Sequence, residues 1–258
     1  MTIPADVKGL PPAVTLETPP FVPRMVMTNE LKTVVRDVLV QWKARKHFVP
    51  LRKYGIRPLD RLLFYGPPGN GKTMACYWIA RELSIPIFRV LCNNLRSSYL
   101  AETAKNTAEV MNFFGKRTDP CIVLWDEVEA IFVNRKDSGK LGEQEYGAAL
   151  TVFMQCLDRW ESPTLLIMAT NLREHLDEAL MSRIELQLEF KGPNLEQCGQ
   201  VIQYWRELLH DHGSDEWGPV IADKFCELPP TSFRELHQII AFAARDWTAK
   251  KFGDPEKK

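Results

Sequence analysis

The segment Gly66–Thr73 restricts the fold more than any other part of this 258-residue sequence. It reads Gly-Pro-Pro-Gly-Asn-Gly-Lys-Thr and fits the pattern G-x-x-x-x-G-K-[ST] at every fixed position. The short apolar run Arg61–Tyr65 precedes it, and a helical pattern follows from about Lys72 to Leu83. The glycines allow backbone N–H groups to turn inward around phosphate groups, and the start of a helix adds positive potential. The segment therefore predicts a strand, a phosphate-binding loop and a helix, in that order.

Residues of this segment have expected roles in binding a nucleoside triphosphate. Lys72 would reach the β- and γ-phosphates, and the hydroxyl of Thr73 would hold Mg²⁺. The residues expected to bind the cofactor ATP are Gly66, Pro67, Pro68, Gly69, Asn70, Gly71, Lys72, Thr73 and Met74. The alternative is an ordinary glycine-rich turn, but a chance match in a chain this long has odds of roughly one in a hundred.

Apolar runs and helical patterns alternate along the chain. The expected strands are Arg61–Tyr65, Ile87–Val90, Cys121–Trp125, Leu165–Ala169 and Ile184–Phe190. Continuous apolar strands separated by helices indicate a parallel sheet covered on both faces. We therefore expect an α/β core over residues 25–191 and a small helical domain over residues 192–251. The proline-rich residues 1–24 predict an extended arm, and residues 252–258 predict a tail.

Polar residues follow two of these expected strands. The strand Cys121–Trp125 is followed by Asp126 and Glu127, and the strand Leu165–Ala169 is followed closely by Asn171. Next to a phosphate loop, Asp126 can orient Mg²⁺ through its water shell, and Glu127 can polarise an attacking water. If the two strands are neighbours, the Asn171 amide lies beside Glu127 and can position that water. Each motif on its own also fits a solvated turn or loop.

Together these motifs resemble the AAA+ ATPases over about residues 25–250. The resemblance implies a parallel five-stranded αβα P-loop core followed by a small α-helical lid, with Mg-dependent ATP hydrolysis as the reaction. It makes Gly66–Thr73 the Walker A motif, Asp126 and Glu127 the Walker B motif, and Asn171 sensor 1.

Two arginines gain roles from the same resemblance. The segment Leu176–Ile184 is similar to the family segment that ends in the arginine finger, which makes Arg183 the finger. The usual Arg-Phe-Asp ending is Arg-Ile-Glu here. Arg234 falls where many AAA+ branches carry sensor 2, although the narrower AAA subgroup usually has a small residue there. Because the family's finger reaches the next subunit's nucleotide, the resemblance implies a homo-oligomeric ring, namely a hexamer. A surface ion pair is the alternative for either arginine.

The segment Asn94–Glu102 resembles the central-pore loop of the protein-remodelling AAA branch. Tyr99 is then the pore aromatic and Leu100 its neighbour, and an aromatic ring on a loop can grip an extended polypeptide by apolar contact. The family's glycine after this pair is Ala101 here. The alternative is a tyrosine packed against its own helix. The basic segment Asn134–Lys140 fits either a second pore loop or a plain surface loop.

Three functions of different classes therefore stay open. The first is a remodeller that threads a protein substrate, with or without an adaptor, and Tyr99 and Leu100 favour it. The second is a DNA-directed AAA+ ATPase such as a loader or transposition regulator, which Arg234 and the basic pair Arg135-Lys136 allow. The formal net charge of zero, from 33 basic and 33 acidic residues, makes nucleic acid the less favoured partner. The third is an ATP-dependent scaffold with little turnover, which the complete set of expected catalytic residues argues against.

Composition adds expectations about the protein's surroundings. The six cysteines form no Cys-x-x-Cys pair and lie mostly in apolar patterns, so buried reduced thiols are expected rather than a disulfide framework or a zinc site. The first residues lack the charged and apolar regions of a secretory signal, and no apolar run reaches spanning length. We therefore expect a cytoplasmic protein with no membrane partner.

Overall fold

The computed structural model describes residues 9–18, 25–96, 102–132, 140–210, 214–227 and 229–252. The chain forms two compact units. The core unit consists of Asn29–Gly66 and Lys72–Glu189 together with the N-terminal segment, and the lid unit consists of Arg24–Thr28, Pro67–Gly71 and Phe190–Lys258. The central part of the phosphate loop thus groups with the helical lid.

The core unit is built on a six-stranded sheet in the order β1-β3-β4-β5-β2-β6. Its strands are β1 (Val14–Glu17), β2 (Arg61–Tyr65), β3 (Ile87–Leu91), β4 (Cys121–Asp126), β5 (Thr164–Thr170) and β6 (Leu186–Glu189). Strands β2 to β6 pair in parallel, which confirms the predicted α/β class and parallel sheet.

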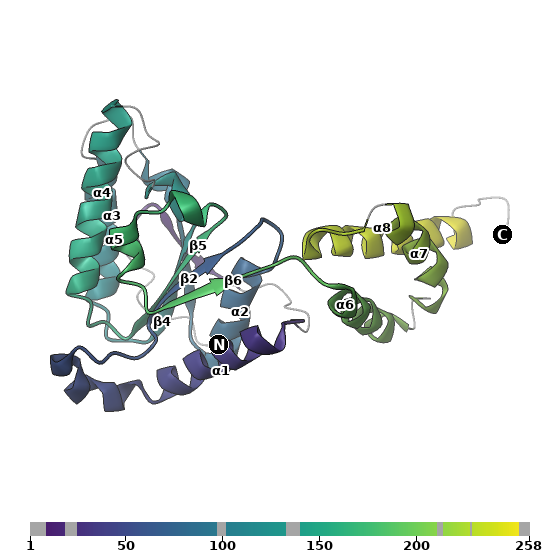
Figure 1. Ribbon diagram of the computed structural model, residues 1–258, viewed down its shortest axis with the longest axis horizontal. Helices are drawn as coiled ribbons and strands as arrows, with labels where there is room; N and C mark the ends of the chain where they lie inside the picture. Colours follow the sequence, from purple (N-terminus) through teal and green to yellow (C-terminus); the bar gives the residue numbers. More distant parts are fainter. Residues whose placement is uncertain are drawn as a thin grey trace. The chain divides into compact units, whose positions relative to one another are not determined.

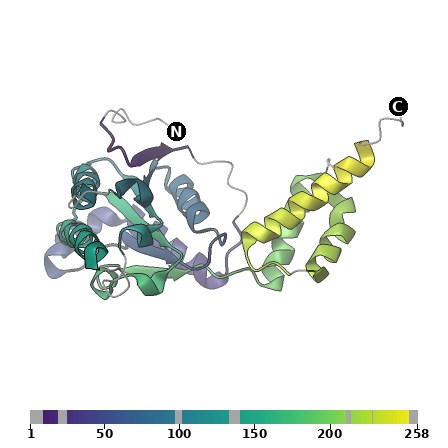
Figure 2. The ribbon, with the colours of Figure 1, turned by 90° about the horizontal axis from the view of Figure 1, so that it is seen from above.

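Strand β1 is an addition to the five strands that the sequence predicted. It lies at the edge of the sheet and pairs antiparallel with β3, with Val14 opposite Val90 (Figure 2). The sequence indicated only an extended arm here, because four residues between prolines carry too short a pattern to identify a strand partner. Part of that arm therefore belongs to the sheet.

Helices cover both faces of this sheet. They are α1 (Asn29–Lys43), α2 (Lys72–Leu83), α3 (Glu102–Gly115) and α4 (Lys140–Asp158), with the short α5 (Glu178–Met181) before β6. Helices α3 and α4 lie on one face, and α1 and α2 lie on the other (Figure 1). Short 3-10 helices connect these elements: η2 (Arg45–Tyr54), η3 (Cys92–Leu95), η4 (Val128–Ala130) and η5 (Arg173–His175).

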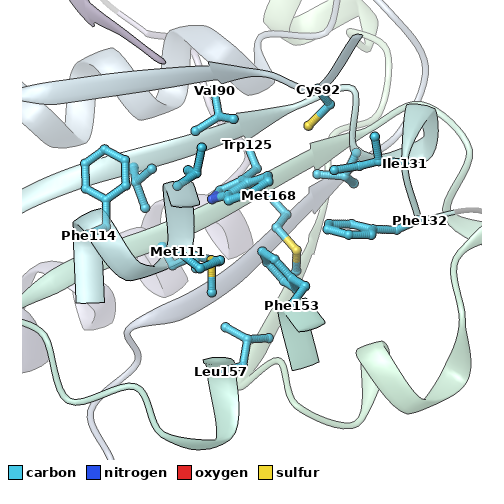
Figure 3. Packing of buried hydrophobic residues seen from close by; sticks show 14 of the residues in the cluster. Val90, Cys92, Met111, Phe114, Trp125, Ile131, Phe132, Phe153, Leu157 and Met168 are labelled. Atoms are coloured by element: carbon cyan, nitrogen blue, oxygen red, sulfur yellow. The ribbon is translucent and has the colours of Figure 1, made fainter. Parts of the chain in front are cut away.

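Alternate residues of each strand point to opposite faces, so an apolar strand can fill both layers of the core. In β4, the side chain of Trp125 points to the face that α3 and α4 cover, and it is fully buried (Figure 3). Its ring lies 4.9 Å from that of Phe153 in an edge-to-face arrangement, and the rings of Phe153 and Phe132 are 4.5 Å apart. This aromatic cluster anchors α4 and the segment after η4 to the centre of the sheet.

The lid unit has a core of its own. Its elements are α6 (Leu195–Leu208), η7 (Ser214–Trp217), α7 (Gly218–Glu227) and α8 (Phe233–Phe252), which bury a cluster that includes Cys198, Leu236 and Ile240. Asn194 and Gln197 form a capping box at the start of α6. Ser232 caps α8, since its hydroxyl accepts a hydrogen bond from the Glu235 backbone N–H at 3.2 Å.

Two further findings concern the whole described chain. Within the described residues, no helix combines the length and the apolar character needed to cross a lipid bilayer. The described cysteine side chains Cys76, Cys92, Cys121, Cys156 and Cys198 are free thiols.

Charged side chains are buried where β2 begins. The Arg61 guanidinium donates to Glu185, and the Arg61 backbone N–H donates to the same carboxylate at 2.8 Å. The neighbouring Asp60 side chain is only 3% exposed, and its carboxylate lies 3.8 Å from Arg61 and 3.9 Å from Arg52. Burial, with a contribution from the Glu185 carboxylate, raises the pKa of Asp60 to about 7.

This raised pKa predicts that Asp60→Asn stabilises the protein in a pH-dependent way. The folded chain holds the Asp60 proton more tightly than the unfolded chain, so the stability associated with that proton is lost as pH rises toward 7. Asparagine carries no ionisable proton. We therefore expect the unfolding free energy of Asp60→Asn to exceed that of the wild-type chain by about 2 kcal/mol more at pH 8 than at pH 5. Chemical denaturation at the two pH values measures this difference.

The matched control is Asp223→Asn, which changes an exposed carboxylate on α7. It should show no such pH dependence. An equal loss of stability at both pH values in Asp60→Asn would mean that the Asp60 carboxylate is ionised and stabilising throughout that range.

Candidate functional site

The sequence-predicted polar residues of the core unit lie at the carboxyl ends of three neighbouring strands. Asp126 ends β4, Asn171 follows β5, and Lys72 opens α2 one loop after β2. Strand β5 lies between β4 and β2, so the condition set for Asn171 and Glu127, that their strands are neighbours, is met. Parallel pairing therefore brings these three chain segments to one edge of the sheet.

The ammonium group of Lys72 links two of these segments. Its Nζ donates to the carbonyl oxygen of Gly66 at 2.6 Å and to Oδ1 of Asn171 at 2.8 Å. Lys72 is only 8% exposed, which is unusual for lysine. Both of these acceptors are neutral oxygens, and they orient the ammonium group. A phosphate oxygen is a ligand that such an oriented ammonium can bind.

Asp126 is paired with an arginine that the sequence analysis did not single out. Nη2 of Arg89, on β3, lies 2.6 Å from Oδ2 of Asp126. Burial alone would lower the pKa of Arg89, but the charge and hydrogen bond of Asp126 outweigh burial and raise it. The guanidinium therefore stays charged. The available signal was a lone arginine inside the apolar run Ile87–Leu91.

Glu127 has a left-handed backbone, with φ 57° and ψ 49°. This conformation costs a residue with a side chain about 1–2 kcal/mol, and such strain concentrates at functional sites. Nδ2 of Asn93, in η3, donates to Oε2 of Glu127 at 2.7 Å. The sequence analysis missed Asn93, which lies two residues after the end of β3. The contact fixes one oxygen of the carboxylate that is expected to polarise water.

Glu129 is a further residue that the sequence analysis missed. Its Oε1 accepts a hydrogen bond from the backbone N–H of Asn171 at 3.1 Å, which ties η4 to the end of β5. Its other oxygen, Oε2, is buried and has no hydrogen-bond partner among the described residues. Because the bond involves the Asn171 backbone, it positions the residue whose side chain contacts Lys72.

The phosphate loop contacts the start of α8 within the lid unit. The Arg234 backbone N–H donates to the carbonyl of Gly69 at 3.1 Å, and the Phe233 N–H donates to Oδ1 of Asn70 at 3.4 Å. Nδ2 of Asn70 donates to the carbonyl of Phe190 at 3.4 Å. The structure thus brings the sensor 2 candidate Arg234 against the phosphate loop through its backbone.

Glycine is required at two positions of this loop. Gly69 and Gly71 have φ values of 82° and 91°, in the left-handed region that side chains disfavour. A Cβ atom added at Gly69 would lie 2.9 Å from Cβ of Arg234, a distance that real contacts essentially never show. The close approach of α8 therefore depends on the absence of a side chain at Gly69.

Arg183 forms an ion pair within its own core unit. Its Nε and Nη2 donate to the two oxygens of Asp158 at 2.8 and 3.1 Å, and its Nη1 donates to the Ala179 carbonyl at 2.8 Å. Asp158 ends α4, so the pair joins α4 to the turn after α5. This is the ion pair that the sequence analysis kept as the alternative, and the role of arginine finger stays a prediction.

The pore-loop residues Tyr99 and Leu100 lie outside the described residues, and so do residues 134–139 of the second candidate pore loop. Their expected roles stay predictions.

The residues present fit ATP with Mg²⁺. Among the described residues, no group of three or more His, Cys, Asp or Glu side chains is placed to hold a metal ion. The Thr73 hydroxyl and the Asp126 carboxylate provide hard oxygen ligands of the kind that Mg²⁺ binds, and phosphate oxygens and water normally complete its shell. The left-handed glycines and the buried Lys72 ammonium suit a phosphate chain.

A strand, a glycine-rich loop and a helix within a parallel αβα core define the chain as a P-loop nucleotide-binding protein. The family described as "ATPase family associated with various cellular activities (AAA)" matches residues 62–191, which are half of the chain. The chain therefore belongs to the AAA family of ATPases, as its resemblance implied.

Curated relatives agree with this assignment. The "Uncharacterized AAA family ATPase y4kL" of Sinorhizobium fredii is 35% identical over 169 residues, which cover 66% of this chain and 50% of the relative. The "26S proteasome regulatory subunit S10B homolog B" of Arabidopsis thaliana is 28% identical over 173 residues, with 66% and 43% covered. The "Probable 26S proteasome regulatory subunit 10B" of Caenorhabditis elegans is 29% identical over 197 residues, with 75% and 47% covered. The chain spans about half the length of these relatives.

A solved structure shares the fold. A chain of the E. coli MS115-1 HORMA:CdnC:Trip13 complex superposes with a TM-score of 0.54 at 18% identity, and 83% of this chain and 86% of that chain are covered. At this identity the similarity concerns the fold alone.

The conformation of Gly69 predicts a loss of stability in Gly69→Ala. The new methyl group would require both a left-handed alanine and a shift of the Arg234 backbone. We expect a loss of at least about 1 kcal/mol in the unfolding free energy, measured by chemical denaturation.

Gly199→Ala is the matched control, because Gly199 lies in α6 with open space where its Cβ would be. Alanine there should stabilise the protein by about 0.5–1 kcal/mol, since it favours the helix. Equal effects of the two substitutions would contradict the close packing of the phosphate loop on α8.

Proposed function

We propose that this chain hydrolyses ATP with Mg²⁺ as a subunit of a homo-oligomeric ring, a hexamer, and that hydrolysis drives the remodelling of a protein substrate. The observation that supports it most is the hydrogen-bonded chain of Gly66, Lys72 and Asn171 beside Asp126 and Glu127, at the carboxyl ends of β2, β4 and β5. Each of these groups has a distinct task in phosphoryl transfer to water.

The nucleotide-binding part of the proposal concerns Gly66–Met74. Backbone N–H groups of this segment bind the phosphates, and Lys72 adds its positive charge. Thr73 and Asp126 would hold Mg²⁺, which would neutralise phosphate charge when bound. Arg234 acts as sensor 2 from the start of α8, a role supported by its backbone hydrogen bond to Gly69.

The hydrolytic part concerns Glu127. Its carboxylate accepts a hydrogen bond from the attacking water and takes up the proton. The Asn93 amide, bound to Oε2, orients the carboxylate so that the other oxygen can face the water. Asn171 fixes the position of Lys72 at the same edge of the sheet.

We propose a ring because Arg183 is expected to act on the nucleotide of a neighbouring subunit. An arginine supplied to the transition state accelerates phosphoryl transfer by about 10³–10⁵. Within a single chain, Arg183 is bound to Asp158, on the core unit's own α4. As a finger it would exchange this carboxylate for the γ-phosphate bound by a neighbouring subunit. Assembly would then control the rate of hydrolysis.

We propose that the free energy of ATP hydrolysis is used to remodel a protein substrate. Relatives are named as proteasome regulatory subunits. The resemblance of Asn94–Glu102 to the pore loop of the remodelling branch points to the same use. Tyr99 and Leu100 would contact the polypeptide in this chain. A protein substrate or adaptor is therefore the proposed partner.

The reaction is tested by turnover in the presence of an unfolded protein. We expect the unfolded protein to increase ATP hydrolysis by the wild-type chain. Glu127→Gln should bind ATP and accumulate as a ring but show neither basal nor stimulated turnover, because it lacks the carboxylate that polarises water. Failure of Glu127→Gln to bind ATP would contradict the role of Glu127. Stimulation by DNA in place of unfolded protein would favour a DNA-directed ATPase.

A mixing experiment tests the finger. Arg183→Ala subunits bind ATP but offer no finger, and Lys72→Ala subunits offer a finger but bind ATP poorly. Each variant alone should be inactive, and a mixture should regain part of the wild-type turnover because complementary neighbours meet in a mixed ring. Absence of recovery at every mixing ratio would contradict a finger that acts on the neighbouring subunit.

A further inference from the structure

A pocket of about 790 Å³ lies at the opposite edge of the sheet from Lys72, Asp126, Glu127 and Asn171. It is lined by η2 and by the segments that precede β2, β4 and β5, at the amino ends of these strands. Lys72, Asp126, Glu127 and Asn171 stand at the carboxyl ends. A strand of five to seven residues is roughly 17–23 Å long, so the pocket is separate from the candidate nucleotide site.

Positive charge predominates in this basic pocket. Its lining includes the cations Arg45, Lys46, Arg52, Lys53 and Arg57 and the carboxyl groups of Asp60 and Glu161. The chain as a whole has zero formal net charge, so the excess of cations is a local feature.

The guanidinium groups of the pocket are held largely by neutral oxygens. Arg45 donates to the Trp42 carbonyl at 3.0 Å, Arg52 to the Glu161 carbonyl at 3.1 Å, and Arg57 to a carbonyl at 2.9 Å. Carbonyl oxygens orient a guanidinium but leave its charge in place. A carboxylate ligand could therefore form charge-assisted hydrogen bonds with groups that are already positioned.

Asp60 compensates this positive charge only in part. Burial raises its pKa to about 7, so the carboxyl is partly protonated at neutral pH. Its Oδ1 is buried and has no hydrogen-bond partner among the described residues, and Arg52 lies 3.9 Å from the other oxygen. A polar group thus remains incompletely satisfied at the wall of the pocket.

Apolar side chains are exposed on the same element. Along η2 and just after it, Val49 is 62% exposed, Tyr54 71%, Ile56 50% and Leu51 37%. Val49 also lines the pocket, together with the apolar surfaces of Pro58, Pro120 and Pro163. Exposed apolar residues that surround a charged pocket are typical of protein interaction sites.

We propose that the basic pocket and the exposed face of η2 bind an acidic peptide segment of a partner protein, one in which carboxylate and aliphatic side chains alternate. The carboxylates pair with Lys46, Lys53 and the arginines. The aliphatic side chains cover Val49 and Leu51. This site is independent of the proposed ATPase cycle, since it uses none of its residues.

The chemistry of the pocket favours a peptide over a nucleic acid. Proteins that bind single-stranded nucleic acid commonly stack bases on open aromatic rings, and Trp42, which lines the pocket, is only 2% exposed. The Tyr54 ring on η2 is exposed, and the Lys53 ammonium lies over it, 4.9 Å from the ring centroid. Aliphatic exposure on η2 suits the side chains of a peptide.

The proposal is tested by fluorescence anisotropy with the full chain and a labelled synthetic peptide in which glutamate and leucine alternate. The double variant Lys46→Glu/Lys53→Glu reverses two exposed charges of the pocket. We expect it to bind the peptide about tenfold more weakly than the wild-type chain. The control Lys32→Glu/Lys105→Glu makes the same charge change at exposed positions on α1 and α3 that do not line the pocket. It should bind within about twofold of wild type.

Other outcomes would overturn the proposal. Equal weakening by both double variants would mean that net charge alone attracts the peptide. Loss of binding in Tyr99→Ala, with no loss in Lys46→Glu/Lys53→Glu, would assign the peptide to the candidate pore loop. Stronger binding of a single-stranded oligonucleotide than of the peptide would assign the pocket to nucleic acid. A change in sedimentation of Lys46→Glu/Lys53→Glu would assign the surface to contacts between copies of this chain. Unchanged denaturation midpoints and basal ATP hydrolysis of Lys46→Glu/Lys53→Glu and Lys32→Glu/Lys105→Glu show that these two variants are folded.

Discussion

The parallel pairing of the five strands β2 to β6 determines which charged residues gather at each edge of the sheet. Five apolar strands with a common direction have their carboxyl ends at one edge and their amino ends at the other. Lys72, Asp126 and Asn171 therefore meet at one edge, although they are far apart in sequence. The amino ends gather Asp60, Arg61 and the basic pocket at the opposite edge.

Buried charged side chains of this sheet have partners of different kinds. Asp126 has a full ionic partner in Arg89, whereas the Lys72 ammonium contacts neutral oxygens of Gly66 and Asn171. A charge that neutral dipoles orient keeps its capacity to attract an anion, while an ion pair has used much of that capacity. Gly66 and Asn171 thus orient the Lys72 ammonium, and Arg89 holds the Asp126 carboxylate in place.

The ion pair of Arg183 with Asp158 connects the proposed reaction to assembly. A guanidinium that forms two hydrogen bonds to a carboxylate on its own chain has a defined position before any neighbour arrives. The pair is partly exposed, with 30% and 52% of the two side chains accessible, so solvent weakens it. A more highly charged phosphate group can then compete for the arginine. Hydrolysis and assembly are coupled through this exchange in the proposed mechanism.

The local sequence pattern was sufficient to predict much of the fold. The parallel sheet, the glycine-rich loop between β2 and α2, and the helical lid follow from apolar periodicity and from residues adjacent in sequence. The contacts Arg89–Asp126, Asn93–Glu127, Glu129–Asn171 and Arg61–Glu185 could not be predicted in this way, because strand order and register bring these residues together. Strand β1 was missed for the same reason, since a four-residue segment becomes a strand only where β3 offers an unpaired edge. Chain chemistry therefore decided which groups could bind a nucleotide, and tertiary pairing decided which partner holds each of them.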